Sequence, residues 1–189
     1  MNISDHIWND NYKHCLFNLA SIMKAKRILE NGVREGYSTH SFLELVRITS
    51  GHVTSIDYSD KCEFMGRCPE DLKPYWTTII KDAREGLKDL NKDRQIFDII
   101  FLDDCHDYLH VKEEVELCEN LMTYDSLLLI HDAMYYDYEP RYRKNQDYGK
   151  YGFADGGVYR VLQELDRTRW EFVTIPVPHG VSVLRKILV

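Results

Sequence analysis

The sequence is short of basic residues. Its 24 lysines and arginines face 31 aspartates and glutamates, which gives a formal net charge of −7. Non-specific nucleic-acid binding depends on basic side chains that neutralise phosphates, so we do not expect nucleic acid as a partner. No apolar run approaches the about 20 residues that cross a bilayer, so no membrane partner is expected. The opening residues, MNISDHIWND, lack a basic segment followed by an apolar one, which predicts no signal peptide.

Cysteines are few and are not closely paired. The five are Cys15, Cys62, Cys68, Cys105 and Cys118. An odd number without close pairing predicts free thiols and a reducing, cytoplasmic setting. Cys62 and Cys68 could be metal ligands, but no second pair with zinc-site spacing lies near them, so ordinary thiols are the better interpretation.

Repeats and low-complexity linkers are also absent, and 189 residues fit one domain. Residues 1–24 have the apolar spacing of a helix. After them, short apolar runs alternate with segments of helical periodicity. Strands are expected at 27–31, 52–57, 77–81, 96–103 and 126–132, and helices at 38–49, 82–90, 108–122 and 157–167. This alternation predicts an α/β fold with a parallel sheet and helices on both faces.

The C-terminal part departs from the alternation. Two strands, expected at 170–177 and 181–189, are separated only by the residues PHG. A parallel pair needs a crossover of about a dozen residues, so this connection permits only a hairpin. The prediction is a doubly wound, mostly parallel sheet closed by an antiparallel C-terminal hairpin, with His179 as a turn residue.

The segment ENGVREG follows the first expected strand. Gly32 and Gly36 would let the backbone turn tightly and approach a ligand closely, and Glu30 is an acceptor at the strand tip. The second strand ends at Asp57, whose carboxylate can bind two ribose hydroxyls. A tight turn without any ligand is the alternative. Because ligands of parallel sheets sit beyond the carboxyl ends of the strands, the combination favours a nucleoside-containing cofactor.

Four motifs identify a family resemblance. The dinucleotide fingerprint G-x-G-x-x-G is incomplete, because Arg34 stands where its middle glycine is expected. Instead LENGVREGYST, SIDYSD, FDIIFLDDCHDY and LLIHDAM, in this order, resemble class I S-adenosylmethionine-dependent methyltransferases. The pattern is similar to the small family of macrocin O-methyltransferase-like and cephalosporin-hydroxylase-like proteins, from about Arg27 to Lys186. It implies a Rossmann-like sheet of seven strands and methyl transfer to a small-molecule hydroxyl, on a sugar or an aromatic ring.

The resemblance also implies cofactor-binding residues. The methionine part of S-adenosylmethionine would lie among Glu30, Gly32, Gly36, Ser38 and Thr39, the ribose at Asp57, the adenine near Asp82 and the sulfonium beside Asp103. From the residue pattern alone, Ser38 or Thr39 is a possible N-cap of the following helix.

Polar residues follow two neighbouring buried strands. Asp103 and His106 come after one, and His131 and Asp132 come after the next. Asp103, Asp132 and, less surely, His131 could hold a Mg²⁺-like or Mn²⁺ ion that lowers the pKa of a substrate hydroxyl. His106 is equally a candidate catalytic base and a structural hydrogen-bond donor.

For other residues near this cluster we expect structural roles, and several of them differ from the residues usual in the family. Asp107 is expected to be an N-cap, and Asp104 to be solvated. Relatives usually have glycine in place of Asp104, an acid in place of Cys105, and Glu-Asp in place of His131-Asp132. A histidine there would shift metal preference toward manganese, iron or zinc.

Residues 133–157 form a long, tyrosine-rich connection. Such loops are usually lids or binding loops, so we expect a lid over the acceptor site or, equally, a contact in a homo-oligomer. Two alternatives to a methyltransferase remain at this point. One is a nicotinamide-dependent oxidoreductase on a Rossmann sheet, and the other is a non-catalytic module that binds the cofactor.

Overall fold

A seven-stranded sheet forms the centre of the computed structural model, which describes residues 3–134, 156–177 and 179–188. The strands are β1 (Arg27–Asn31), β2 (His52–Asp57), β3 (Trp76–Ile80), β4 (Phe97–Leu102), β5 (Met122–His131), β6 (Trp170–Ile175) and β7 (Val181–Lys186). Their order across the sheet is β3-β2-β1-β4-β5-β7-β6. The reversal between β1 and β4 creates the switch point at which open α/β sheets bind their ligands.

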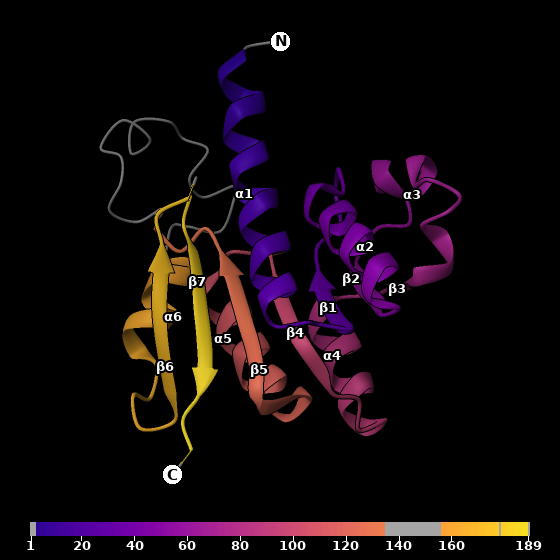
Figure 1. Ribbon diagram of the computed structural model, residues 1–189. Helices are drawn as coiled ribbons and strands as arrows, with labels where there is room; N and C mark the ends of the chain where they lie inside the picture. Colours follow the sequence, from indigo (N-terminus) through magenta and orange to yellow (C-terminus); the bar gives the residue numbers. More distant parts are fainter. Residues whose placement is uncertain (1–2, 135–155, 178, 189) are drawn as a thin grey trace.

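Helices cover both faces of this sheet (Figure 1). They are α1 (Ile3–Ile22), α2 (Tyr37–Thr49), α3 (Glu63–Arg67), α4 (Ala83–Lys92), α5 (Tyr108–Cys118) and α6 (Gly157–Glu164), with short 3-10 turns at Lys73–Tyr75 and Glu119–Leu121. The α1 and α2 helices pack together on one face, and α4, α5 and α6 cover the other. The doubly wound architecture expected from the sequence is therefore confirmed.

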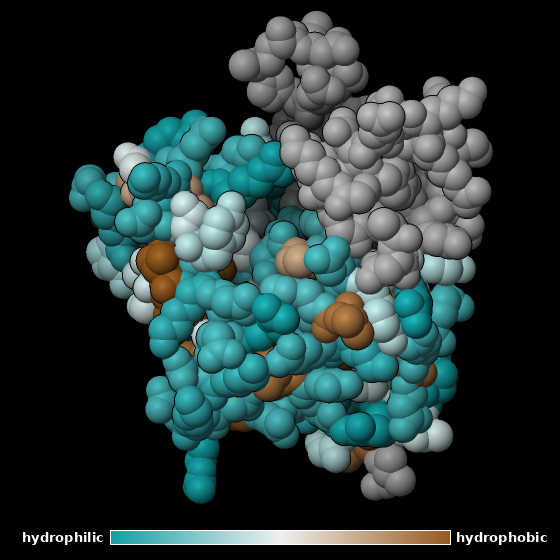
Figure 2. Space-filling model, turned by 180° about the vertical axis from the view of Figure 1, so that it is seen from behind, coloured by the Kyte–Doolittle hydropathy of each residue, from teal (hydrophilic) through white to brown (hydrophobic). Residues whose placement is uncertain are grey.

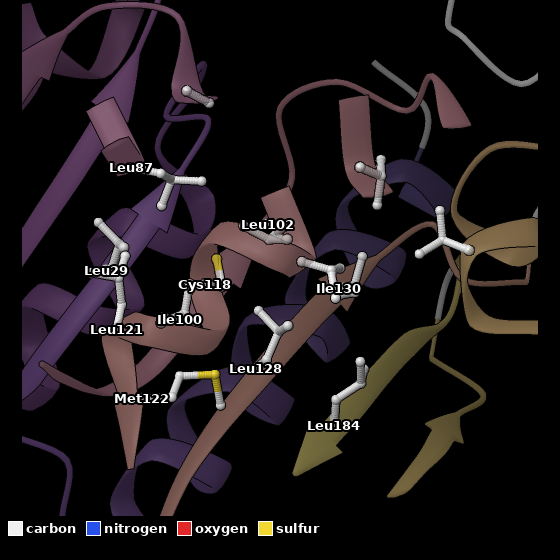
Figure 3. Close-up of a cluster of buried hydrophobic side chains, with 14 of the residues drawn as sticks. Leu29, Leu87, Ile100, Leu102, Cys118, Leu121, Met122, Leu128, Ile130 and Leu184 are labelled. Atoms are coloured by element: carbon white, nitrogen blue, oxygen red, sulfur yellow. The ribbon is translucent and has the colours of Figure 1, made fainter. Parts of the chain in front are cut away.

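The central strands explain why the two layers hold together. In β4 the side chains of Ile99, Ile100 and Phe101 are all fully buried, because each face of the strand meets a helical layer. Figure 3 shows the apolar cluster on the α4–α5 side, where Leu87 of α4 and Cys118 of α5 face the sheet. The solvent-facing side of the layer formed by α4 and α5 is mostly hydrophilic, and its exposed apolar residues are set apart from one another (Figure 2).

The C-terminal hairpin is confirmed, and its place in the sheet is new information. The β7 strand runs antiparallel to β6, as expected, and also to β5, with Leu184 opposite Leu128 on one side and Phe172 on the other. The last strand is thus inserted between β5 and β6. Val181 and Leu184 of β7 are fully buried, which suits an interior strand, whereas β6 forms the edge.

Some local expectations were wrong. The α2 helix begins at Tyr37 with Gly36 as its N-cap, so Ser38 and Thr39 lie inside its first turn and do not cap it. The short helix α3 was not expected. Most of the predicted lid, residues 135–155, lies outside the described residues and stays a prediction. Within the part of the chain that is described, no helix has the length and apolar character needed to cross a membrane.

Candidate active site

The turn after β1 packs directly on the loop after β4, at the switch point. The Gly32 amide donates to the Ile56 carbonyl at 2.9 Å, and the Asp103 amide donates to the Asn31 carbonyl at 3.0 Å. Gly32 has φ +90°, and a Cβ there would lie 2.4 Å from the Asp103 carbonyl oxygen. Glycine is therefore required at position 32, because the backbone approaches that of Asp103 closely and because residues with a side chain rarely adopt this φ.

Gly36 is constrained by a side chain. Its φ is +76°, and a Cβ would lie 2.1 Å from the ring of Phe64 on α3. A cavity of about 370 Å³ opens beside it and is lined by residues of α1, α2 and α3, among them Lys13, Tyr37 and Phe64. The cavity therefore adjoins the glycine turn and not the polar residues after β4 and β5.

Glu30 is fully buried at the end of β1. Its carboxylate accepts hydrogen bonds from three hydroxyls: Ser38 Oγ at 2.5 Å, Thr39 Oγ1 at 2.7 Å and Ser55 Oγ at 2.8 Å. Burial raises the pKa of Glu30 to about 7, although these three bonds act in the opposite direction. The expected grouping of Glu30 with Ser38 and Thr39 thus exists as a buried network that fixes the first turn of α2.

Asp57 holds the glycine turn from the end of β2. Its Oδ2 accepts from the amides of Val33 at 2.8 Å and Arg34 at 3.4 Å, and its Oδ1 accepts from the amide of Ser59 at 2.9 Å. These bonds orient the carboxylate at the strand ends. Oδ1 accepts only one of these bonds and has a lone pair for a further donor, so Asp57 can still receive a hydroxyl group.

Asp82 is the N-cap of α4. Its Oδ1 accepts from the Arg84 amide at 3.0 Å, and both of its oxygens accept from the Arg84 guanidinium. The hydrogen bond from the Arg84 side chain lowers the pKa of Asp82 to about 2. Its carboxylate is therefore ionised and already engaged, so a contact with adenine would compete with Arg84.

The cluster that we call the strand-end cluster contains Asp103, His106, His131 and Asp132. Ligand atoms of Asp103, His131 and Asp132 all lie within 4.8 Å of one another. His131 Nδ1 is 3.1 Å from Asp103 Oδ1 and 3.6 Å from Asp132 Oδ2. His106 Nε2 is 2.6 Å from Asp132 Oδ2. The structure thus brings together every residue that the sequence proposed for a metal or for proton transfer.

Electrostatics couple the members of the strand-end cluster. Desolvation lowers the pKa of His106, but its hydrogen bonds to Asp103 and Asp132 and their charges raise it to about 10. Although burial acts against ionisation of Asp103, the charges and hydrogen bonds of His131 and His106 hold its pKa well below the usual range. At neutral pH the cluster therefore contains a His106 imidazolium between carboxylates.

Sequence reasoning missed His179 at this site. Its Nδ1 lies 3.8 Å from Asp132 Oδ1, and its ring meets that of His131 edge to face at 5.8 Å between centroids. Both Asp132 (φ 56°) and His179 (φ 62°) adopt the left-handed conformation, which is uncommon for residues other than glycine and often found at functional sites. The only sequence signal was a histidine in a tight turn beside an apolar strand.

A second polar cluster lies between the loop after β4 and α5. His110 Nε2 is 3.1 Å from Asp104 Oδ2, and the Asn31 amide Nδ2 donates to Glu114 Oε1 at 2.7 Å. Desolvation lowers the pKa of His110, but Asp104, Cys105 and Glu114 raise it to about 10. The expectation that Asp104 is merely solvated was wrong, because its side chain is mostly buried against His110.

Asp107 is the N-cap residue of α5 by position, although its side chain makes no capping hydrogen bond. All five cysteines are free.

Solved structures similar to this chain include methyltransferases. The chain aligns with a Podospora anserina methyltransferase, PaMTH1, solved with S-adenosylhomocysteine, at 23% identity and TM-score 0.77, covering 94% of this chain and 78% of that one. It also aligns with the Streptomyces achromogenes O-methyltransferase TomG, solved with S-adenosylmethionine, at 17% identity and TM-score 0.72, covering 94% and 80%. The Bacillus cereus O-methyltransferase with S-adenosylhomocysteine gives 18% identity and TM-score 0.68, covering 94% and 81%.

At these identities the structural likeness establishes the fold. No curated protein sequence matches the chain. A family model described as a methyltransferase domain matches residues 29–133, more than half of the chain, including the glycine turn, Asp57 and the strand-end cluster. The chain therefore belongs to this methyltransferase family and is a class I S-adenosylmethionine-dependent methyltransferase.

Proposed function

We propose that the enzyme transfers the methyl group of S-adenosylmethionine to a hydroxyl oxygen of a small molecule. The observation that carries this proposal is the strand-end cluster, whose carboxylates and imidazoles converge beside the glycine turn. Two of the similar structures, from Streptomyces achromogenes and Bacillus cereus, are O-methyltransferases, which supports oxygen as the nucleophile.

Asp57 and the glycine turn are the proposed cofactor contacts. Asp57 is fixed by three backbone amides and would receive the ribose hydroxyls. Glu30 would act indirectly, because its oxygens are taken up by hydroxyl groups of Ser38, Thr39 and Ser55. Gly32, Gly36 and the first turn of α2 would surround the methionine part, and Asp82 would lie near the adenine.

The donor set of the strand-end cluster fits a divalent cation. Asp103 and Asp132 offer carboxylate oxygens, and His131 offers an imidazole nitrogen, all within the spacing of one coordination sphere. Two oxygens and one nitrogen suit Mg²⁺ less well than Mn²⁺. Such an ion would lower the pKa of the acceptor hydroxyl, and S-adenosylmethionine supplies the electrophilic methyl group.

His106 can accept the proton of the acceptor hydroxyl only in its neutral form. Its pKa of about 10 keeps it protonated while both carboxylates remain uncompensated. A role as base therefore requires that the negative charge of Asp103 and Asp132 first be neutralised. Until then, the positive charge of His106, whose Nε2 lies 2.6 Å from Asp132 Oδ2, offsets the negative charge of the carboxylates.

The acceptor is proposed only at the level of a small molecule, and a homo-oligomer and a cytoplasmic location stay predictions. The nicotinamide-dependent alternative is not favoured by the family match. A non-catalytic module would bind S-adenosylmethionine without turnover.

The test is a screen for S-adenosylhomocysteine formation by mass spectrometry. The enzyme is incubated with S-adenosylmethionine and with catechols, phenols or sugars, in Mg²⁺, Mn²⁺ or EDTA. Formation of a methyl ether with any acceptor supports the proposal. Methylation at nitrogen alone, or cofactor binding without turnover of any acceptor, would overturn it. A parallel thermal-shift titration compares S-adenosylmethionine with NAD, since a ligand at about 100 times its dissociation constant adds about 2.7 kcal/mol.

A further inference from the structure

The second polar cluster has the composition of a metal site. One ligand atom from each of Asp104, His110 and Glu114 lies within 4.8 Å of the others. His110 Nε2 is 3.1 Å from Asp104 Oδ2 and 3.8 Å from Glu114 Oε2. Ligands around a tetrahedral zinc with bonds of about 2.0–2.1 Å are about 3.3 Å apart. The three atoms therefore need only small side-chain adjustments to share one ion.

The helix α5 aims two of these ligands at the sheet. His110 and Glu114 are four residues apart and so share one face of the helix. The next residue on that face, Cys118, lies in the apolar cluster on the sheet (Figure 3). Glu114 is therefore carried into the interior, where its side chain is fully buried.

Buried polar atoms in this cluster lack partners. Among the described residues, Glu114 Oε2, Asp104 Oδ1 and Asn31 Oδ1 have no hydrogen-bond donor, and Asn31 is also fully buried. A buried polar group without a partner destabilises the fold, and more so when it is charged. His110 alone does not supply a donor to any of these three oxygens, which leaves room for a further cation in the cluster.

A proton does not meet this need as well as a cation does. A proton shared between the side chains of Asp104 and Glu114 can join one oxygen of each, but it leaves Asn31 Oδ1 without a donor. A divalent cation contacts several oxygens and the imidazole nitrogen together. Asn31 donates its Nδ2 to Glu114 Oε1 at 2.7 Å, which leaves Glu114 Oε2 as the carboxylate oxygen available to a cation.

We propose that Asp104, His110 and Glu114 bind a divalent cation of the zinc class at a structural site separate from the strand-end cluster. One nitrogen and two carboxylate oxygens are acceptable zinc ligands. The imidazole binds the metal in its neutral form, and metal binding releases its proton. The two sites share no ligand, because Asp103 faces His131 whereas Asp104 faces His110.

This site joins three segments that position the active site. Asp104 directly follows Asp103, Asn31 directly precedes Gly32, and Glu114 belongs to α5. A cation there would fix the loop after β4 against the end of β1. The expected effect is on stability and on the order of the active-site loop, and it does not require methyl transfer to be correct.

The experiment removes the strand-end cluster first. The full chain carrying His131→Ala and Asp132→Asn is dialysed against Zn²⁺, and bound metal is measured by mass spectrometry, with Co²⁺ absorption as a second readout. About one Zn²⁺ per chain is expected to remain. Adding Glu114→Gln is expected to weaken affinity at least tenfold, a loss that even an outer-shell partner can cause. Glu113→Gln is the matched control, because Glu113 is half exposed and pairs with Arg84 and Lys88.

His110→Ala is a second variant of the same site, used because Glu114→Gln could lose metal through a folding defect. His110 lies nearer the surface than Glu114, so its replacement should disturb the fold less. It is also expected to abolish the Co²⁺ absorption. The proposal is overturned if the parent chain binds no Zn²⁺ or Co²⁺. It is equally overturned if both Glu114→Gln and His110→Ala bind these ions as tightly as Glu113→Gln does.

Discussion

His106 Nε2 lies 2.6 Å from Oδ2 of Asp132, so an imidazolium sits against a carboxylate that we assign to a cation. The two residues follow different strands, β4 and β5, which run side by side in the sheet. The charge of His106 also helps to hold the pKa of the nearby Asp103 carboxyl below its usual range. It also makes the cluster sensitive to pH.

The His106 contact predicts a pH-dependent stability in EDTA. The folded pKa of His106, about 10, exceeds its ordinary value of 6.5, so the contribution is fully present below about pH 6.5 and is lost as pH rises through 10. His106→Gln should therefore flatten the decrease in unfolding free energy over this range, measured by urea denaturation. His14→Gln, a change at an exposed histidine, should leave the profile as it is. Parallel profiles for wild type and His106→Gln would contradict the prediction.

Glu30 predicts a pH dependence at lower pH. Burial raises its pKa from 4.5 to about 7, so between these values the folded state binds a proton that the unfolded state has released. Unfolding free energy should fall as pH rises from about 4.5 to 7, by on the order of 3 kcal/mol at most. Glu30→Gln should remove most of this slope. Denaturation at several pH values checks it, and an unchanged slope would show that Glu30 stays ionised.

Gly32→Ala should destabilise the fold strongly. The new Cβ would lie 2.4 Å from the Asp103 carbonyl oxygen at a φ of +90°, and the cost should be about 2 kcal/mol or more. Gly66→Ala is the matched control, because a Cβ on Gly66 meets nothing within 4 Å. Chemical denaturation compares the two. Equal stability of the two variants would contradict the prediction, because it would mean that the turn after β1 can move to accommodate the new Cβ.

Much of the fold follows from local sequence. The limits of β1 and β2 match their expected ranges to the residue, because β-branched and apolar runs are bounded there by turn residues. The antiparallel direction of β7 followed from its three-residue connection. Its insertion between β5 and β6 did not, since that depends on which strand can be buried on both faces.

The strand-end cluster was largely predictable, since residues after neighbouring parallel strands meet at one edge of the sheet. His179 was not, because it reaches the cluster only through the insertion of β7. The second cluster was also missed. The four-residue spacing of His110 and Glu114 is visible in the sequence, but their proximity to Asp104 depends on how α5 packs on the sheet. Likewise, Ser38 and Thr39 resemble helix caps until the burial of Glu30 is known.

The central claim is that the strand-end cluster promotes methyl transfer, and the most direct measurement is turnover with S-adenosylmethionine and an acceptor found by the screen. Asp132→Asn should reduce kcat by about 100-fold or more, and EDTA should lower wild-type turnover toward the same value. Asp125→Asn, a change at an exposed residue near the start of β5, should retain full activity. If Asp132→Asn turns over like wild type in Mn²⁺, with cofactor affinity unchanged, the strand-end cluster is not the catalytic centre.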